Sequence, residues 1–102
     1  MNHDEAVRLL ESGVEMNVVA GLISIGLNES DRIWAQRTCL KYFTSNNEAV
    51  VSSAITALGH IARRHGELDK DTALSALEEV KTRCPSLEGV IEDTLDDIEA
   101  FT

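Results

Sequence analysis

The sequence predicts an all-α protein: a single domain, residues 1–102, built as a short α-solenoid of about six helices in antiparallel pairs. Apolar residues recur at helical spacing along the chain, and no stretch alternates apolar with polar residues long enough to form a strand. Proline occurs only once in the 102 residues. The expected linkers are about two to five residues long, so successive helices should pack as antiparallel neighbours.

The first two helices are expected at about residues 4–12 and 17–27. Gly13 is a natural stop for the first of them. The second is apolar on almost every side, which is typical of a central helix buried between two neighbours. Gly21 and Gly26 lower its helix propensity. If the first helix fails to cover it, the second leaves an apolar surface exposed at one end of the stack.

The third helix is expected to begin after residues 28–31, where Asn28 or Ser30 can cap its free amides. Trp34 lies on the flank of its apolar stripe. The residues of that stripe are Ile33, Gln36, Leu40 and Phe43.

The fourth helix has the clearest sequence signature. Ser45 and Glu48 form a capping box at its start, and Gly66 follows its last residue as a stop signal. The basic residues 63–65 complement the negative end of its dipole. Gly59 interrupts it, and we expect this glycine to allow a neighbouring helix to approach closely.

The last two helices flank the only proline. The fifth follows Leu68 and Asp69 and must end before Pro85. Ser86 is then expected to cap the sixth helix. The buried stripe of this last helix is predicted to be Val90, Ile91, Leu95, Ile98 and Phe101.

An internal repeat supports the solenoid. An offset of 37 residues places Val50 on Leu87 and Ile61 on Ile98, and the same offset sets the third helix on the fifth. A helix pair that recurs at such an interval is the signature of an α-solenoid, in which each pair buries its apolar face on the next. The first two helices would be a shorter opening repeat.

Two segments of this repeat have a familiar pattern. Residues 54–63 read AITALGHIAR and resemble the second helix of a HEAT repeat, with its recurring A…LG.IA pattern, and residues 89–98, GVIEDTLDDI, resemble its successor. Together with the helix that carries Trp34, they are similar to small HEAT-like bacterial proteins. Those include immunity proteins of contact-dependent growth inhibition systems. The resemblance covers about residues 30–102 and implies a cytosolic protein that binds and blocks a cognate toxin domain, often a nuclease.

Composition and charge narrow the classes of partner. The formal net charge is −9 and the isoelectric point is about 4.6. Such a chain repels phosphate backbones and anionic headgroups, so we expect no nucleic-acid partner, no membrane partner and a cationic protein instead. No apolar run approaches the roughly 20 residues of a membrane helix, and no signal peptide is evident. Cys39 and Cys84 are expected to be reduced thiols in the cytoplasm.

The sequence offers no catalytic or metal-binding motif. Its three histidines lie outside any ligand or nucleophile pattern, and HExxH, CxxC, Walker and GxSxG motifs do not occur. We therefore expect no enzyme activity, no cofactor and no metal.

The densest cluster of charge lies at the end of the chain, where residues 88–102 hold six acids and no Lys or Arg. Asp93, Asp96 and Asp97 follow i, i+3, i+4 spacing and repel one another on one side of the helix. This cluster is either a polar cap that closes the solenoid or a landing surface for a cationic partner. The offset of 37 matches Asp97 to His60, so Asp97 is in position to pair with His60 or with an adjacent Arg.

These observations lead to a functional hypothesis with one alternative. The chain is expected to be an immunity protein that forms a 1:1 complex with a basic toxin domain, in most cases a nuclease, and occludes it. The alternative is a stand-alone HEAT-like scaffold with no toxin. The predicted partner-binding residues are Glu92, Asp93, Asp96 and Asp97, flanked by His60 and Trp34.

Overall fold

The computed structural model describes residues 2–102, and in this part of the chain it contains six α-helices and no strand. Short turns of 3-10 helix follow the third helix, at Tyr42–Thr44, and precede the sixth, at Pro85–Leu87. The all-α prediction is confirmed. The helices are α1 His3–Glu11, α2 Glu15–Asn28, α3 Arg32–Lys41, α4 Glu48–His65, α5 Lys70–Arg83 and α6 Glu88–Phe101.

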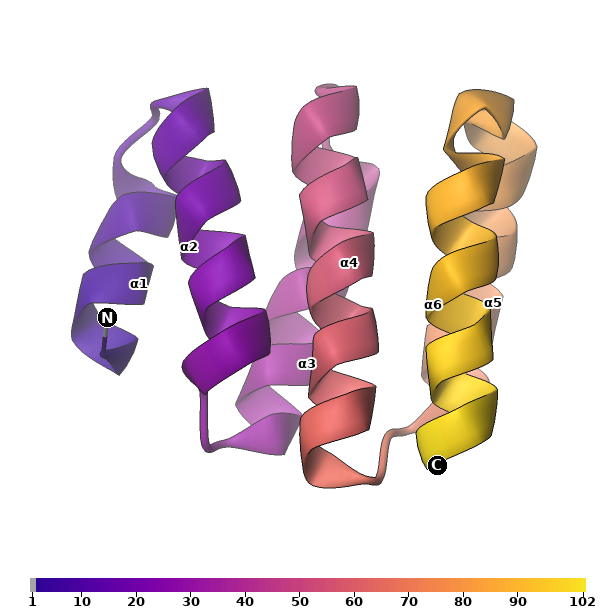
Figure 1. Ribbon diagram of the computed structural model, residues 1–102. Helices are drawn as coiled ribbons and strands as arrows, with labels where there is room; N and C mark the ends of the chain where they lie inside the picture. Colours follow the sequence, from indigo (N-terminus) through magenta and orange to yellow (C-terminus); the bar gives the residue numbers. More distant parts are fainter. Residues whose placement is uncertain (1) are drawn as a thin grey trace.

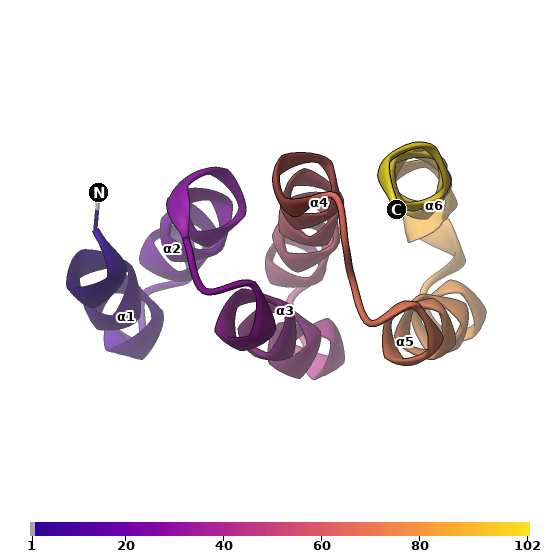
Figure 2. The ribbon, with the colours of Figure 1, turned by 90° about the horizontal axis from the view of Figure 1, so that it is seen from below.

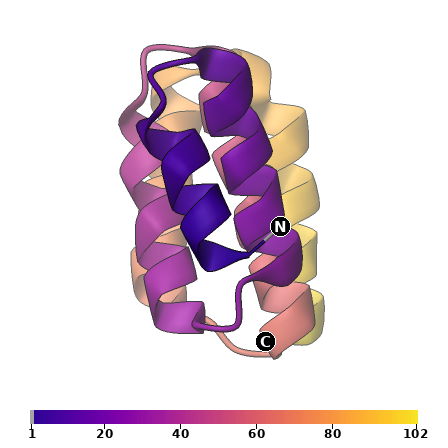
Figure 3. The same ribbon diagram turned by 90° about the vertical axis from the view of Figure 1, so that its left-hand side faces the viewer.

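The helices stack as three antiparallel pairs in two rows. Figure 1 shows consecutive helices running in opposite directions, and Figure 2 shows α2, α4 and α6 in one row with α1, α3 and α5 in the other. Seen from the α1 end, the pairs lie one behind the next (Figure 3). The resulting slab measures 30 × 28 × 18 Å. This is the arrangement of a short α-solenoid, as the repeat predicts.

The centre of the slab is α4, which packs against α2 on one side, α6 on the other and α3 in the second row. Small residues let these backbones approach closely. A Cβ added to Gly26 would lie 2.8 Å from the Cα of Ala57, and one added to Gly59 would lie 3.0 Å from Asp97 Oδ2. Gly59 therefore lies at the contact of α4 with α6, as predicted, although the atoms nearest to it belong to side chains of α6.

Two pairs of residues that are 37 positions apart are also alike in burial. Ala54 and Ile91, and likewise Ile61 and Ile98, are pairs separated by 37 residues in which both members are buried. The first pair, α1 and α2, is shorter than the other two, as expected.

The predicted N-terminal caps of α3 and α4 are wrong. Asp31, rather than Asn28 or Ser30, caps α3 by accepting the Trp34 N–H at 3.0 Å. Asn47 caps α4, while the Ser45 hydroxyl accepts the Asn47 N–H at 3.1 Å. In both cases a carboxylate or amide one residue before the helix, with extended backbone, reaches the third amide directly.

The predicted cap of the last helix is also wrong. Ser86 lies inside the 3-10 turn and hydrogen-bonds Glu48 of α4, and α6 begins without a side-chain cap. Gly66, by contrast, ends α4 as predicted, in a left-handed conformation with φ of 67°.

Some predicted core residues lie at the surface. Ile33 is 63% exposed, because α3 turns Ala35, Gln36 and Cys39 toward the core instead, and Phe101 is 46% exposed. The expectation that α2 is buried on nearly all sides is also wrong. It ends the row, so one face has no neighbour, and Met16 is 82% exposed. No helix within residues 2–102 combines the length and apolarity needed to cross a bilayer.

Candidate partner-binding surface

Three aspartates on α6 form an acidic stripe: Asp93, Asp96 and Asp97. Asp93 and Asp96 are exposed and Asp97 is half-buried. Across residues 2–102, none of the three has a Lys, Arg or His nitrogen within 4.0 Å. Like charges one turn apart raise the free energy of an isolated helix by a few tenths of a kcal/mol per pair. The stripe therefore gains no ion pair within residues 2–102, and Asp93 and Asp96 present their charge to solvent.

Glu92 lies one turn before Asp96, at the edge of the stripe nearest to α5. Its Oε1 lies 3.5 Å from Nζ of Lys81 on α5, and both side chains are about half exposed. The predicted set of four acids is thus divided, with three carboxylates uncompensated and one shared with α5. An exposed pair of this kind contributes about 0–1 kcal/mol to stability.

The side of α6 that faces α4 is fixed by Thr94, whose hydroxyl donates a 3.1 Å hydrogen bond to the buried carbonyl of Ile55. Asp97 lies one turn closer to the C-terminus on the same side, with its carboxylate against Gly59. Asp93 then falls on the solvent side next to α4. The nearest outward residues of α4 are Thr56 and His60, both half-buried.

His60 is thus close to the acidic stripe in register, as predicted, but the expected pairing with Asp97 is absent. The part of the chain that the structure describes contains neither a hydrogen bond nor an ion pair between them. His60 flanks the stripe as a half-buried polar neighbour.

Basic side chains at the C-terminal end of α4 cap the C-terminus of α2. Arg64 Nη1 donates to the carbonyls of Gly26 and Glu29, at 3.0 and 3.1 Å, and His65 Nε2 lies 3.1 Å from the Glu29 carbonyl. These groups satisfy the free carbonyls at the C-terminus of α2 and place positive charge at its negative end. Arg63 turns to the other side, 5.6 Å from the ring centroid of Phe101.

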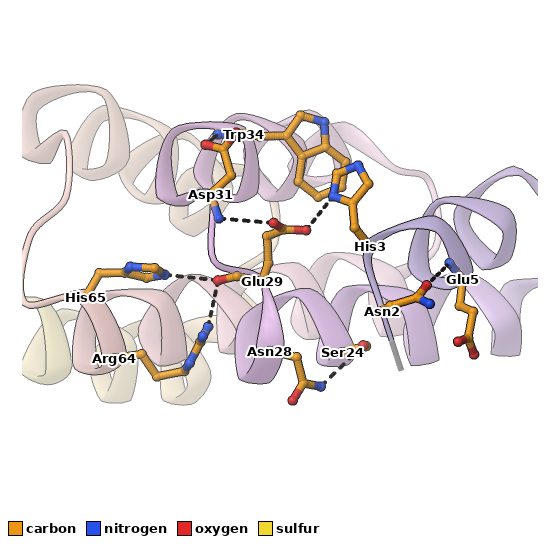
Figure 4. Close-up of polar contacts among 10 residues, drawn as sticks. All are labelled: Asn2, His3, Glu5, Ser24, Asn28, Glu29, Asp31, Trp34, Arg64 and His65. Carbon is orange, nitrogen blue, oxygen red and sulfur yellow. Dashed lines mark hydrogen bonds and ion pairs between the residues drawn. The ribbon is translucent and has the colours of Figure 1, made fainter.

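Glu29 lies at the centre of a buried polar junction that the sequence did not reveal (Figure 4). Its side chain is 6% exposed, and Oε1 lies 2.5 Å from His3 Nδ1, while Oε2 accepts the Asp31 N–H at 3.0 Å. The His3 ring packs on Trp34, with centroids 4.2 Å apart. Glu29 therefore links three parts of the fold. Its carboxylate contacts α1 and the α2–α3 loop, and its backbone carbonyl contacts α4.

The structure places Trp34 on α3, in the second row, where it does not adjoin the acidic stripe. It packs against α1, whereas the acidic stripe lies on α6 at the end of the other row (Figure 2). No partner for Trp34 was evident from the sequence, because the ring that it meets comes from a helix near the start of the chain. It is a packing residue in this structure.

A cavity of about 220 Å³ adjoins the junction and is lined by polar residues that include Asn2, Ser24 and Asn28. Within residues 2–102, no buried side-chain nitrogen or oxygen lacks a hydrogen-bond partner. The buried polar atoms of the junction are therefore paired within the fold.

The thiols and acids offer little chemistry. Burial raises the pKa of the Cys39 thiol to about 12, so it stays protonated at neutral pH and is a poor nucleophile. Across residues 2–102, no three His, Cys, Asp or Glu side chains are grouped so that they could hold a metal ion.

Comparison with known proteins adds no family or relative. No protein-family model, no curated protein and no solved structure matches this chain. Any inference about function therefore rests on the chain's own residues, among which the acidic stripe is the feature that the fold leaves unexplained.

Proposed function

We propose that this chain is an immunity-type inhibitor, which binds a cationic toxin domain in a 1:1 complex in the cytoplasm and blocks it. One observation carries the proposal. Asp93, Asp96 and Asp97 stand on the last helix without an intramolecular cation, although their mutual repulsion costs stability. Charges held at a cost to the fold are expected where a partner compensates them. The resemblance of residues 54–63 and 89–98 to HEAT-like immunity proteins supports the same function.

The proposed mechanism is charge mimicry of a nucleic-acid substrate. A nuclease toxin needs a cationic groove, and a row of carboxylates on a rigid helix can occupy that groove in place of phosphates. The field of the stripe also steers the partner and raises the association rate. Glu92 contributes less to the attraction of the partner, because Lys81 compensates its charge. His60 lies beside the contact. No catalytic step and no cofactor are involved.

The test uses the full chain and an inactivated toxin domain encoded beside it. Affinity should fall at least tenfold between about 50 and about 500 mM salt, because the Debye length shrinks and screens the exposed charges. The double reversal Asp96→Lys/Asp97→Lys should abolish protection against the toxin. The matched control is Glu78→Lys/Glu79→Lys, which reverses two exposed acids on α5. Affinity that ignores both salt and the α6 reversal contradicts charge mimicry.

The second candidate is a stand-alone interaction scaffold with no toxin partner. The two-row helical stack favours it, because such stacks present extended surfaces to other proteins. The neighbouring gene separates the two candidates. A scaffold predicts a housekeeping operon and no protection when the chain is co-expressed with a toxin.

A further inference from the structure

A second surface feature lies at the other end of the same row. Four apolar residues of α2 recur at i, i+4, i+7 and i+11, which places them on one helical face. Met16 is 82% exposed and Leu27 is 49% exposed, Ala20 is exposed and Ile23 is partly buried. We call these residues the α2 stripe: Met16, Ala20, Ile23 and Leu27.

Two glycines fix the direction of the α2 stripe. Gly26 faces α4, at Ala57, and Gly21 faces α1, at Ala6 and Leu10. The α2 stripe occupies the helical face turned away from both contacts, on the outer side of the α2, α4 and α6 row (Figure 2). That outer side also carries Thr56 and His60 of α4.

Thr94 and the Asp97 carboxylate lie on the edge of α6 that meets α4. Asp93 lies one turn before Asp97, so both aspartates border the same outer side. One face of the molecule therefore changes in character from helix to helix. It is apolar on α2, carries Thr56, His60 and then the exposed Arg63 along α4, and is acidic on α6.

We propose that this three-helix face is the docking surface and that its partner presents an apolar patch beside a cationic one. The cationic patch of the partner rests on the proposed function, whereas its apolar patch follows from the exposure of the α2 stripe. Thr56 and His60 of α4 lie between the acidic and the apolar halves of the face. A partner that spans the face would compensate the aspartates and bury Met16 and Leu27 together.

The same charge pattern disfavours the other occupants. An anionic membrane that contacted Met16 would be repelled by the acidic stripe on the same face. A second copy laid face to face must obey two-fold symmetry. Depending on the axis, it sets acid against acid or the α2 stripe against acid, and neither arrangement is complementary.

The two halves should act on different rate constants. Long-range attraction to the acidic stripe speeds association and weakens with salt. Burial of the α2 stripe acts only after contact, so it should slow dissociation and depend little on salt.

The experiment uses the full chain labelled with ¹⁵N and a synthetic helical peptide of leucine and lysine, with Leu on one face and Lys on the other. A peptide of equal charge with glutamine in place of leucine is the comparison probe. Binding of the Leu/Lys peptide should shift amide resonances along α2, α4 and α6. The Gln/Lys peptide should bind at least about tenfold more weakly and shift α6 mainly.

Two pairs of variants locate the contact. Met16→Gln/Leu27→Gln should weaken the Leu/Lys peptide about tenfold or more, through faster dissociation. Ile33→Gln/Leu74→Gln, which changes two exposed apolar residues of α3 and α5, should change affinity less than twofold. Asp93→Asn/Asp97→Asn should slow association and flatten the salt dependence.

The outcomes separate this inference from the proposed function. If the α6 variants weaken binding and the α2 variants do not, the apolar half is overturned and the acidic interface stands. If the peptide shifts α3 and α5 instead, the docking face is overturned. A dimer of the free chain that Met16→Gln/Leu27→Gln disperses would show that a second copy covers α2, which also overturns it.

Discussion

The central helix α4 has two flanks, one packed against α2 and the other against α6, and they use polar residues in opposite ways. Toward α2, Arg64 and His65 bond to backbone carbonyls, and the buried carboxylate of Glu29 ties in His3 and the α2–α3 loop. Toward α6, Thr94 donates to the Ile55 carbonyl, Ser86 hydrogen-bonds Glu48 and Arg63 lies over Phe101, but within residues 2–102 the nearby aspartates form no ion pair. Charge on the first flank is bonded within the fold, while the aspartates on the second form no ion pair within residues 2–102.

The difference shows how to separate structural from functional charge in a chain with a net charge of −9. A carboxylate that is buried and bonded on both oxygens stabilises the fold, and its loss leaves donors without a partner. An exposed, unpaired carboxylate beside others of its sign does the reverse. Mutations on the two flanks should therefore differ in size and in sign.

The largest effect is expected at the junction. Glu29→Ala removes the acceptor of the Asp31 N–H and the partner of His3, so the free energy of unfolding should fall by about 2 kcal/mol. Urea unfolding followed by circular dichroism measures the loss. Glu92→Ala, an exposed acid of α6, is the matched control and should stay within about 0.5 kcal/mol. Equal losses in the two variants would remove the distinction between the flanks.

The next effect compares the two glycines at the contacts of α4 with α2 and α6. Gly26→Ala places a Cβ 2.8 Å from the Cα of Ala57, a backbone atom that cannot move aside, so stability should fall by about 1–2 kcal/mol. Gly59→Ala meets two side-chain atoms, Asp97 Oδ2 at 3.0 Å and Thr94 Oγ1 at 3.3 Å, and gains helix propensity, so the two effects should largely cancel and stability should change by less than about 1 kcal/mol.

Thermal unfolding of both variants decides the point. The expected pattern is a lower midpoint for Gly26→Ala and a nearly unchanged one for Gly59→Ala. An equally lowered midpoint for both would mean that α6 is held as rigidly as α2.

A smaller loss is expected for Thr94→Val, which keeps the side-chain shape and removes the hydrogen bond to Ile55. Because the Ile55 carbonyl retains its helical partner, stability should fall by about 1 kcal/mol or less. Amide hydrogen exchange in α6 should accelerate while exchange in α2 stays unchanged. Faster exchange in both helices would show that the two flanks open together.

Local sequence signals predicted most of the fold. Apolar spacing located all six helices, Gly66 marked the end of α4, and the offset of 37 residues predicted which elements repeat. These signals act within one or two helical turns, or between equivalent helices. Cap positions were less accurate because Asn, Asp and Ser crowd the linkers, and the backbone conformation decides which of them reaches an amide.

The candidate site was predictable only in part. The acidic stripe is visible in the sequence because it lies on one helix. The role of Glu29 was not, because its partners lie 26 residues earlier, at His3, and 35 and 36 residues later, at Arg64 and His65. The α2 stripe was hidden among apolar residues on every side of that helix. Only the packing shows which of them face solvent.

The smallest expected change in stability provides the most direct test of the distinction between the flanks. Asp93→Asn/Asp97→Asn removes two like charges one turn apart, so unfolding should become harder by a few tenths of a kcal/mol or stay unchanged. Binding of the same double variant to the cationic partner should weaken at least tenfold at about 50 mM salt. A variant that loses more than about 1 kcal/mol of stability and binds as tightly as before would contradict this distinction, because these aspartates would then serve the fold.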